Sequence, residues 1–177
     1  MQNPGTHAER IADLLARLNE AADRLATRLE RAGSQAEHAA SGWTAAQVGA
    51  HVALVNDSFS KVVDGSVPAA KPAPEAFAER SWGEVASGIA DRIEAPPRVQ
   101  PPATISGAEA AQQVRASAAR LGHALANLSE ERSRYCFTNP IVGTITVIQV
   151  GDWAIAHMIR HNQQAKRILN AVLDGGS

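Results

Sequence analysis

The chain has 177 residues, a formal net charge of −1 and 45% hydrophobic residues. That length predicts a single domain over residues 1–177, large enough to form a core without help from a metal. The near-neutral charge argues against a nucleic-acid-binding surface, and no apolar run in the sequence approaches the roughly 18 residues that cross a membrane. We therefore expect a cytoplasmic protein with no nucleic-acid or membrane partner.

The alanine-rich composition, with 4% aromatic residues, favours helices over sheet. The first long helical pattern covers residues 7–31, and Gly33 ends it. The second begins after Thr44, which is the expected N-cap, with Gln47 as its capping-box partner. One histidine stands in the apolar row of this second helix, which is formed by Val48, His51, Val52, Val55, Phe59 and Val62.

The second and third helical patterns are joined by residues 65–105, which hold seven of the nine prolines. We expect a short helix at about 74–93 within this crossover, and a connection of such length is expected to rim a site. The third helix begins after Ser106, with Glu109 completing a capping box. The fourth covers about 145–173 and also begins with a capping-box pattern. Together the patterns predict an all-α four-helix bundle with a long proline-rich crossover between helices 2 and 3.

Three histidines lie on inward faces of these helices. His157 and His161 are four residues apart in the fourth helix, so they share one face, and His51 lies in the apolar row of the second. Three neutral imidazoles can hold Zn²⁺, Fe²⁺ or Ni²⁺ and leave positions for water or substrate. The alternative is that each is a hydrogen-bonded core histidine, the usual role of a single buried one. The other histidines are expected in polar or solvent-facing positions: His7, His38 and His123.

The sequence shows no evident fourth ligand among its acidic residues. Asp57 is six residues after His51, and Asp152 is five residues before His157. Both spacings displace the carboxylate from the histidine face of its helix. Each carboxylate is therefore expected either to contact a metal-binding histidine from outside or to be a solvated charge on its helix.

Four further side chains have a structural and a functional interpretation. Gln164 follows His161 by three residues and is expected to be either a core amide or a neighbour of a bound metal. Trp82 and Trp153 are expected to pack, or to line a pocket. Cys136, the only cysteine, excludes an internal disulfide and fits a reducing compartment, and we do not expect it to be a ligand.

Two motifs resemble a known family. The pattern Gly-Trp-Thr-Ala-Ala-Gln-Val-x-x-His at residues 42–51 resembles the start of helix two in the DinB-like (YfiT-like) superfamily of metal-binding four-helix bundles. The run Asn-Pro-Ile-Val-Gly-Thr-Ile-Thr at 139–146, followed by His-x-x-x-His-x-x-Gln at 157–164, resembles that family's fourth-helix signature. The resemblance covers the architecture of nearly the whole chain and is motif-specific at these two places.

The resemblance implies a divalent metal ion, zinc, nickel or iron, held by His51, His157 and His161. Some relatives carry a carboxylate at the position of His157, so the site in this chain is expected to be neutral and open. The family includes S-transferases and isomerases that use low-molecular-weight thiols, as well as hydrolases, and homodimers are common in it. The resemblance therefore implies a small-molecule substrate and a homodimer, and it leaves the catalytic residues unassigned.

Three functions remain open at this point. A thiol-dependent S-transferase is favoured, because three neutral ligands leave the ion doubly charged and suited to an anionic thiolate. A metal-dependent hydrolase would also need a general base, and the inward rows of helices two and four contain no Asp or Glu. Glu75, Glu79 or Glu84 of the crossover would have to supply it. A non-catalytic metal-binding or stress-response bundle is the third alternative, and a closed fourth ligand would indicate it.

Overall fold

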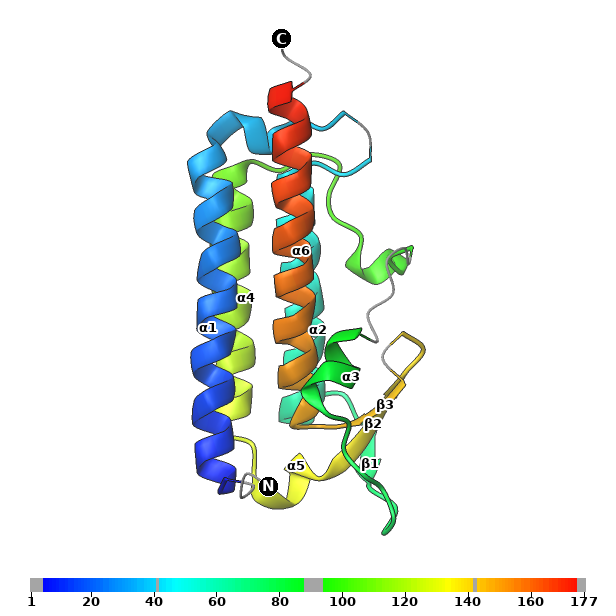
Figure 1. The fold of residues 1–177 in the computed structure, drawn as a ribbon. Coiled ribbons are helices and arrows are strands. Elements are labelled where there is room, and N and C mark those ends of the chain that lie inside the picture. Colours follow the sequence, from blue (N-terminus) through cyan, green and yellow to red (C-terminus); the bar gives the residue numbers. More distant parts are fainter. Residues whose placement is uncertain (1–4, 41, 88–93, 142, 175–177) are drawn as a thin grey trace.

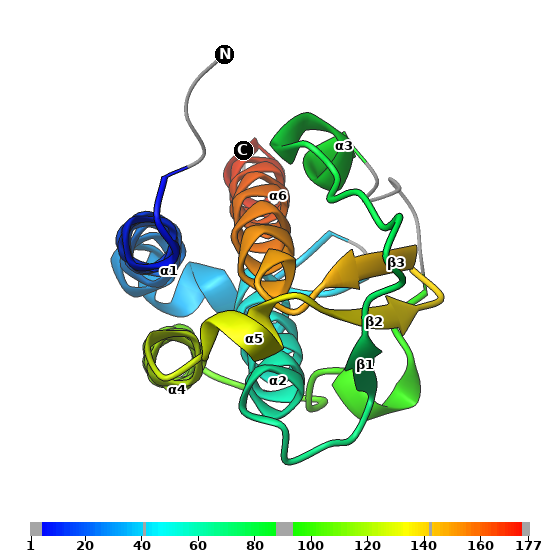
Figure 2. The same ribbon diagram turned by 90° about the horizontal axis from the view of Figure 1, so that it is seen from below.

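The computed structural model describes residues 5–40, 42–87, 94–141 and 143–174. It is mostly helical, as predicted from the sequence, and a small sheet lies beside the helices (Figure 1). The four long helices are α1 (His7–Ala32), α2 (Ala45–Asp64), α4 (Gly107–Ala126) and α6 (Gln149–Asp174). Seen along their axes, α4 packs against α1 and α2, and α6 packs against the same two helices from the other side (Figure 2).

The predicted helix starts are confirmed at α2 and α4. The Thr44 hydroxyl accepts a hydrogen bond from the Gln47 backbone N–H at 3.1 Å, and the Gln47 side chain returns the interaction to the Thr44 N–H at 3.0 Å. Ser106 caps α4 by accepting from the Glu109 N–H at 3.1 Å. The predicted end of α1 is also confirmed, since Gly33 has a φ of 54°, in the region that glycine tolerates best. These local signals set where the long helices begin and end.

The predicted start of the fourth helix is wrong. Thr146 ends a strand, and α6 begins three residues later at Gln149. Of the predicted capping box only one half forms, in which the Gln149 side chain accepts from the Thr146 N–H at 3.4 Å, while the Thr146 hydroxyl donates to the Glu79 carboxylate at 2.7 Å instead of capping the helix. The β-branched residues before it suit a strand, and they form one edge of an antiparallel sheet that was not predicted. In spatial order the strands are β1 (Ala70–Pro72), β2 (Tyr135–Asn139) and β3 (Gly143–Thr146).

The connection between α2 and α4 is long because these two helices run in the same direction (Figure 1). A 20-residue helix rises about 30 Å, and the chain must return over that length before α4 can begin. Along this path lie β1, the short helix α3 (Trp82–Ser87) and the 3₁₀ turn η2 (Pro97–Val99). A helix was expected at about 74–93, and in the described part of this segment it covers only Trp82–Ser87. Residues 88–93 lie outside the described residues.

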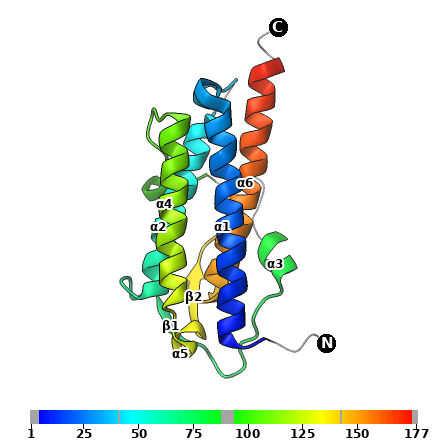
Figure 3. The ribbon, with the colours of Figure 1, turned by 90° about the vertical axis from the view of Figure 1, so that its left-hand side faces the viewer.

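Two short elements complete the fold. The 3₁₀ turn η1 (Gly33–Glu37) leads from α1 towards α2, and α5 (Glu130–Ser133) leads from α4 into β2. The sheet and α3 lie beyond α2 and α6, whereas α1 and α4 form the opposite side of the molecule (Figures 2 and 3). Among the described residues, none of the helices combines the length and apolar character that crossing a membrane requires.

The start of α4 approaches the end of α1 so closely that only glycine fits at position 107. A Cβ added to Gly107 would lie 2.9 Å from the Leu29 carbonyl oxygen and 2.9 Å from the Ala36 Cβ. We expect Gly107→Ala to lower the free energy of unfolding by about 1–3 kcal/mol, because backbone atoms would have to move. Urea unfolding measures this, and Gly83→Ala is the control, since a Cβ there meets nothing within 4 Å. Equal stability of the two variants would contradict this close packing.

Candidate metal centre

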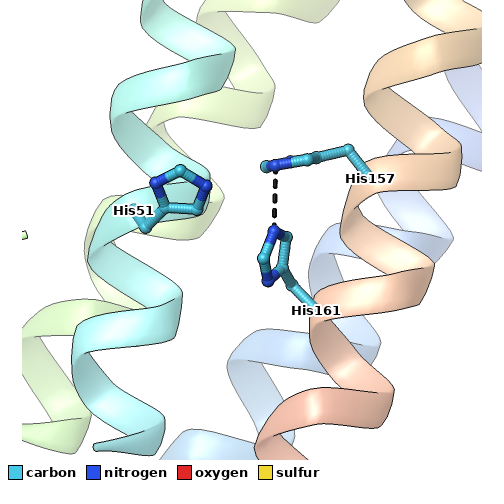
Figure 4. Close-up of side chains that lie close together, drawn as sticks. All are labelled: His51, His157 and His161. Atoms are coloured by element: carbon cyan, nitrogen blue, oxygen red, sulfur yellow. Dashed lines mark hydrogen bonds between the residues drawn. The ribbon is translucent and has the colours of Figure 1, made fainter. Parts of the chain in front are cut away.

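The three predicted histidines meet in the space between α2 and α6 (Figure 4). His51 extends from α2 towards His157 and His161 of α6, and 6%, 4% and 8% of their respective surfaces are exposed. One ring nitrogen of each lies within 4.8 Å of those of the other two. The i, i+4 spacing on α6 places the Nε2 atoms of His157 and His161 3.0 Å apart. The exposed His38 and His123 have no place in this cluster, and the His7 ring contacts the Leu128 carbonyl instead.

Hydrogen bonds on the outer side of the cluster fix the protons of two rings. His51 Nδ1–H donates to the Val99 carbonyl at 2.7 Å, and His161 Nδ1–H donates to Gln164 Oε1 at 2.8 Å. Because an oxygen of this kind only accepts, the proton of each neutral ring is on Nδ1 and the lone pair is on Nε2. Metal-binding histidines show this same arrangement, in which an outer acceptor orients the ring and makes it more basic.

The third ring is the one whose hydrogen bonding is incomplete. His157 Nδ1 is buried without a hydrogen-bond partner in the described structure, and its Nε2–H donates to the Nε2 lone pair of His161 at 3.0 Å. Two nitrogens bound at about 90–109° to one ion at about 2.1 Å lie about 3.0–3.4 Å apart, and these two lie at the short end of that range. A cation between the two rings would replace the Nε2 proton of His157 and accept both lone pairs. The three imidazoles therefore form a donor set that a divalent metal ion could bind.

Burial keeps all three imidazoles in the neutral form that binds metals. It lowers the pKa of His51, against the opposing effect of the bond to Val99. It lowers the pKa of His161 to about 3, with a further contribution from His51 and an opposing one from Gln164. The pKa of His157 lies well below its usual value, first through burial and then through the charges of His161, His51 and Arg160. At neutral pH a metal ion thus competes with no second proton on any ring.

Aromatic side chains hold the histidine rings in place. Trp153 stacks on His157 with ring centroids 4.8 Å apart and an interplanar angle of 18°, and Phe59 packs against Trp153 in an edge-to-face contact. Trp43 contacts the His51 ring at 5.1 Å. The expectation of a pocket-lining role therefore fits Trp153. Trp82 is 39% exposed and lies under Arg17 outside this site.

A cavity of about 700 Å³ opens beside the histidines. Its walls come from α2, from α6, from crossover residues 94–100 and from the turn between β2 and β3. Trp43, Phe59, Ile141 and Trp153 give it an apolar part close to the three rings. A small molecule entering the cavity would reach the histidines directly, which is the arrangement that a substrate site needs.

The acidic candidates named from the sequence lie elsewhere. Asp57 forms an ion pair with Arg120 at 2.8 Å, and Asp152 lies 3.7 Å from Arg10 and 3.5 Å from Arg17. Asp57 is thus a partly exposed charge paired with an arginine, and Asp152 is a mostly buried one between two arginines. In the described residues, no Asp, Glu or Cys joins the three histidines to close the site.

The three glutamates considered as general bases also lie away from the cavity. Glu79 is bound to Arg10 and Thr146, Glu84 accepts from Ser81 at the start of α3, and Glu75 is exposed. The carboxylate that lines the cavity is that of Glu94, which the sequence did not single out. Glu94 lies in the crossover, where no helical repeat relates sequence position to a face. Its place at the cavity could therefore be found only from the structure.

Arginines around the cavity were also missed. Arg98, Arg160 and Arg167 line it together with the histidines. The last two had a signal in the sequence, since residues 160, 164 and 167 follow the helical spacing that places them beside His161.

Comparison with protein families gave one match. The family model of the DinB superfamily matches residues 12–165, which include all three histidines and most of α1 to α6. Searches of curated protein sequences and of solved structures gave no significant match.

Proposed function

The chain belongs to the DinB superfamily, and on that premise we propose that its three-histidine cluster binds one divalent metal ion, with zinc, nickel and iron as the candidates. In this proposal the four long helices are the four-helix bundle of the family, and the ligands come from α2 and α6. The observation that carries it is the convergence of His51, His157 and His161, buried and neutral, on the wall of a cavity. Their Nε2 lone pairs are the donor set that such ions prefer.

The outer acceptor of His161 offers a first test of metal binding. Gln164→Leu removes the oxygen that holds the Nδ1 proton and leaves all three proposed ligands in place. We expect metal affinity to fall about 10–100-fold, as is typical when an outer partner of a ligand is lost. Competition with a chromophoric chelator measures it. The control is Gln163→Leu, because Gln163 is an exposed neighbour outside the cavity. Equal affinities of both variants would show that Gln164 does not orient the ring.

We further propose that the reaction is thiol-dependent S-transfer. A divalent ion held here would lower the pKa of a thiol and favour its nucleophilic thiolate form. The protein contributes neutral ligands, which leave the positive charge uncompensated, and the apolar wall of Phe59 and Trp153, which excludes water. The thiol sulfur forms a bond to the electrophile, the leaving group departs with the bonding electron pair, and the thiol proton is released to solvent.

Hydrolysis is the second candidate, and Glu94 is the observation that favours it. Its carboxylate lines the cavity and could act as the general base that hydrolysis of an ester or amide needs. The three-histidine site itself suits either reaction. A purely structural metal is less well supported, because no fourth ligand closes the cluster within the described residues.

One assay separates these functions. Metal-loaded protein is given an electrophile with and without small thiols, beside a panel of esters and amides. We expect product only when thiol and metal are both present, and we expect His161→Ala to abolish it. Hydrolysis without thiol that Glu94→Gln abolishes would replace transfer by hydrolysis. No turnover in either assay would favour the non-catalytic function.

A further inference from the structure

The cavity beside the histidines concentrates positive charge. Three arginines, Arg98, Arg160 and Arg167, line it, and Glu94 is the one carboxylate among the described lining residues. Three positive charges and one negative give the wall a formal charge of +2. The whole chain, with 17 Lys and Arg against 18 Asp and Glu, has a net charge of −1. This wall therefore differs in sign from the protein as a whole, and a cleft lined by one sign of charge attracts ligands of the opposite sign.

Two of these arginines have no partner to neutralise them. Arg98 and Arg167 are exposed, and neither side chain forms a hydrogen bond or an ion pair within the part of the chain described. Arginines on other surfaces do: Arg120 binds Asp57 through two hydrogen bonds, and Arg115 binds Glu30. The guanidinium groups of Arg98 and Arg167 are thus available to an incoming anion.

The three arginines can be placed relative to the histidines by their elements. Arg167 lies six residues after His161 on α6, which corresponds to a rise of about 9 Å. Arg98 directly precedes Val99, whose carbonyl accepts a hydrogen bond from His51. Arg98 therefore belongs to the cavity wall on the His51 side. Arg160 directly precedes His161 in α6 and lines the same cavity. The positive charge is therefore spread from the histidines outwards along the cavity.

We infer that the substrate of this site carries an oxyanion, a carboxylate or a phosphate, which Arg98 and Arg167 bind while its reactive end reaches the three histidines. The inference rests on the proposed function, because it names the charge of the molecule that the metal site would act on. Planar guanidinium groups bind both kinds of oxyanion through paired charge-assisted hydrogen bonds. Arg160 adds attraction along the path between the two ends.

Matched thiols on the cobalt-loaded protein test the inference, since thiolate binding to cobalt is visible in the absorption spectrum. The four probes are 3-mercaptopropionate, 2-mercaptoethyl phosphate, uncharged 2-mercaptoethanol and cationic cysteamine. We expect at least one anionic thiol to bind about tenfold more tightly than 2-mercaptoethanol, and cysteamine to bind more weakly. Which anionic thiol gains more distinguishes carboxylate from phosphate. The advantage should shrink as salt is raised.

Single variants that each remove one positive charge identify the residues that bind the anionic group. Arg98→Gln and Arg167→Gln should each weaken binding of the anionic thiol about three- to tenfold, as partly exposed charge pairs do, and leave 2-mercaptoethanol unaffected. Lys166→Gln is the control, because Lys166 is the exposed neighbour of Arg167 and does not line the cavity. Equal binding of charged and neutral thiols, or an equal loss in the Lys166 variant, would overturn the inference.

A metal-free arm separates this inference from the proposed function. Carboxylates and phosphates also bind metals directly, so the metal-free protein is titrated with succinate and with inorganic phosphate, neither of which has a thiol. Binding that Arg98→Gln and Arg167→Gln both reduce supports the anion site. If no thiol binds the cobalt protein while this arm succeeds, S-transfer fails and the anion site stands. If all thiols bind alike and this arm shows no binding, the anion site fails and thiol binding stands.

Discussion

Replacing His51, His157 or His161 by Ala is expected to lower affinity for a divalent ion at least about a hundredfold. Each change removes one of three converging Nε2 donors, and losing even an outer partner of a ligand costs about 10–100-fold. Loss of His157 should be as severe as loss of the other two, since its Nε2 lies 3.0 Å from that of His161. Metal content after dialysis and competition with a chelator both measure the effect.

The control for this result is His123→Ala, which removes an exposed histidine of α4 outside the cluster. It should retain full metal content. Circular dichroism of each variant establishes that the helices are intact, so that loss of metal is not mistaken for unfolding. Full metal content in His51→Ala would contradict the three-histidine assignment.

The metal-free protein is expected to lose stability steeply as the pH falls from about 6.5 to about 3. Burial lowers the pKa of His161 from 6.5 to about 3, and it lowers the pKa values of His51 and His157 as well. Between these pH values the unfolded imidazole binds a proton and the folded one does not. The stability is therefore complete above about 6.5 and is lost as the pH falls towards 3. For His161 alone the loss is on the order of 4–5 kcal/mol.

Urea unfolding of the metal-free protein at several pH values measures this dependence. His161→Phe removes the titrating ring and retains an aromatic side chain, so its stability should fall less steeply over the same pH range. His123→Ala should follow the wild-type curve, because His123 is exposed. The same slope in wild type and His161→Phe would mean that the buried ring does not resist protonation.

Helical periodicity made the three-histidine cluster predictable. A repeat of 3.6 residues relates sequence spacing to a face, so His51 among valines and the His157–His161 pair were assigned correctly to inward faces. The capping residues Thr44 and Ser106 marked helix starts for a similarly local reason. Whether the three histidines bind metal remains a prediction.

The rest of the cavity depends on contacts that local patterns do not encode. The Val99 carbonyl, which accepts the hydrogen bond of His51, lies in a turn 48 residues later in the chain. Glu94 and Arg98 line the cavity from the same segment. Thr146 has the sequence pattern of a helix cap, yet pairing of β3 with β2 places it in a strand. Tertiary pairing overrides local preference in such short segments.

A crystal structure of the zinc-loaded protein, with anomalous data collected at the zinc edge, tests metal binding at this site most directly. We predict one ion per chain within about 2.1 Å of Nε2 of His51, His157 and His161, with no fourth side chain bound and the remaining positions facing the cavity. An ion held elsewhere, or a fourth side chain that closes the site, would contradict an open three-histidine centre.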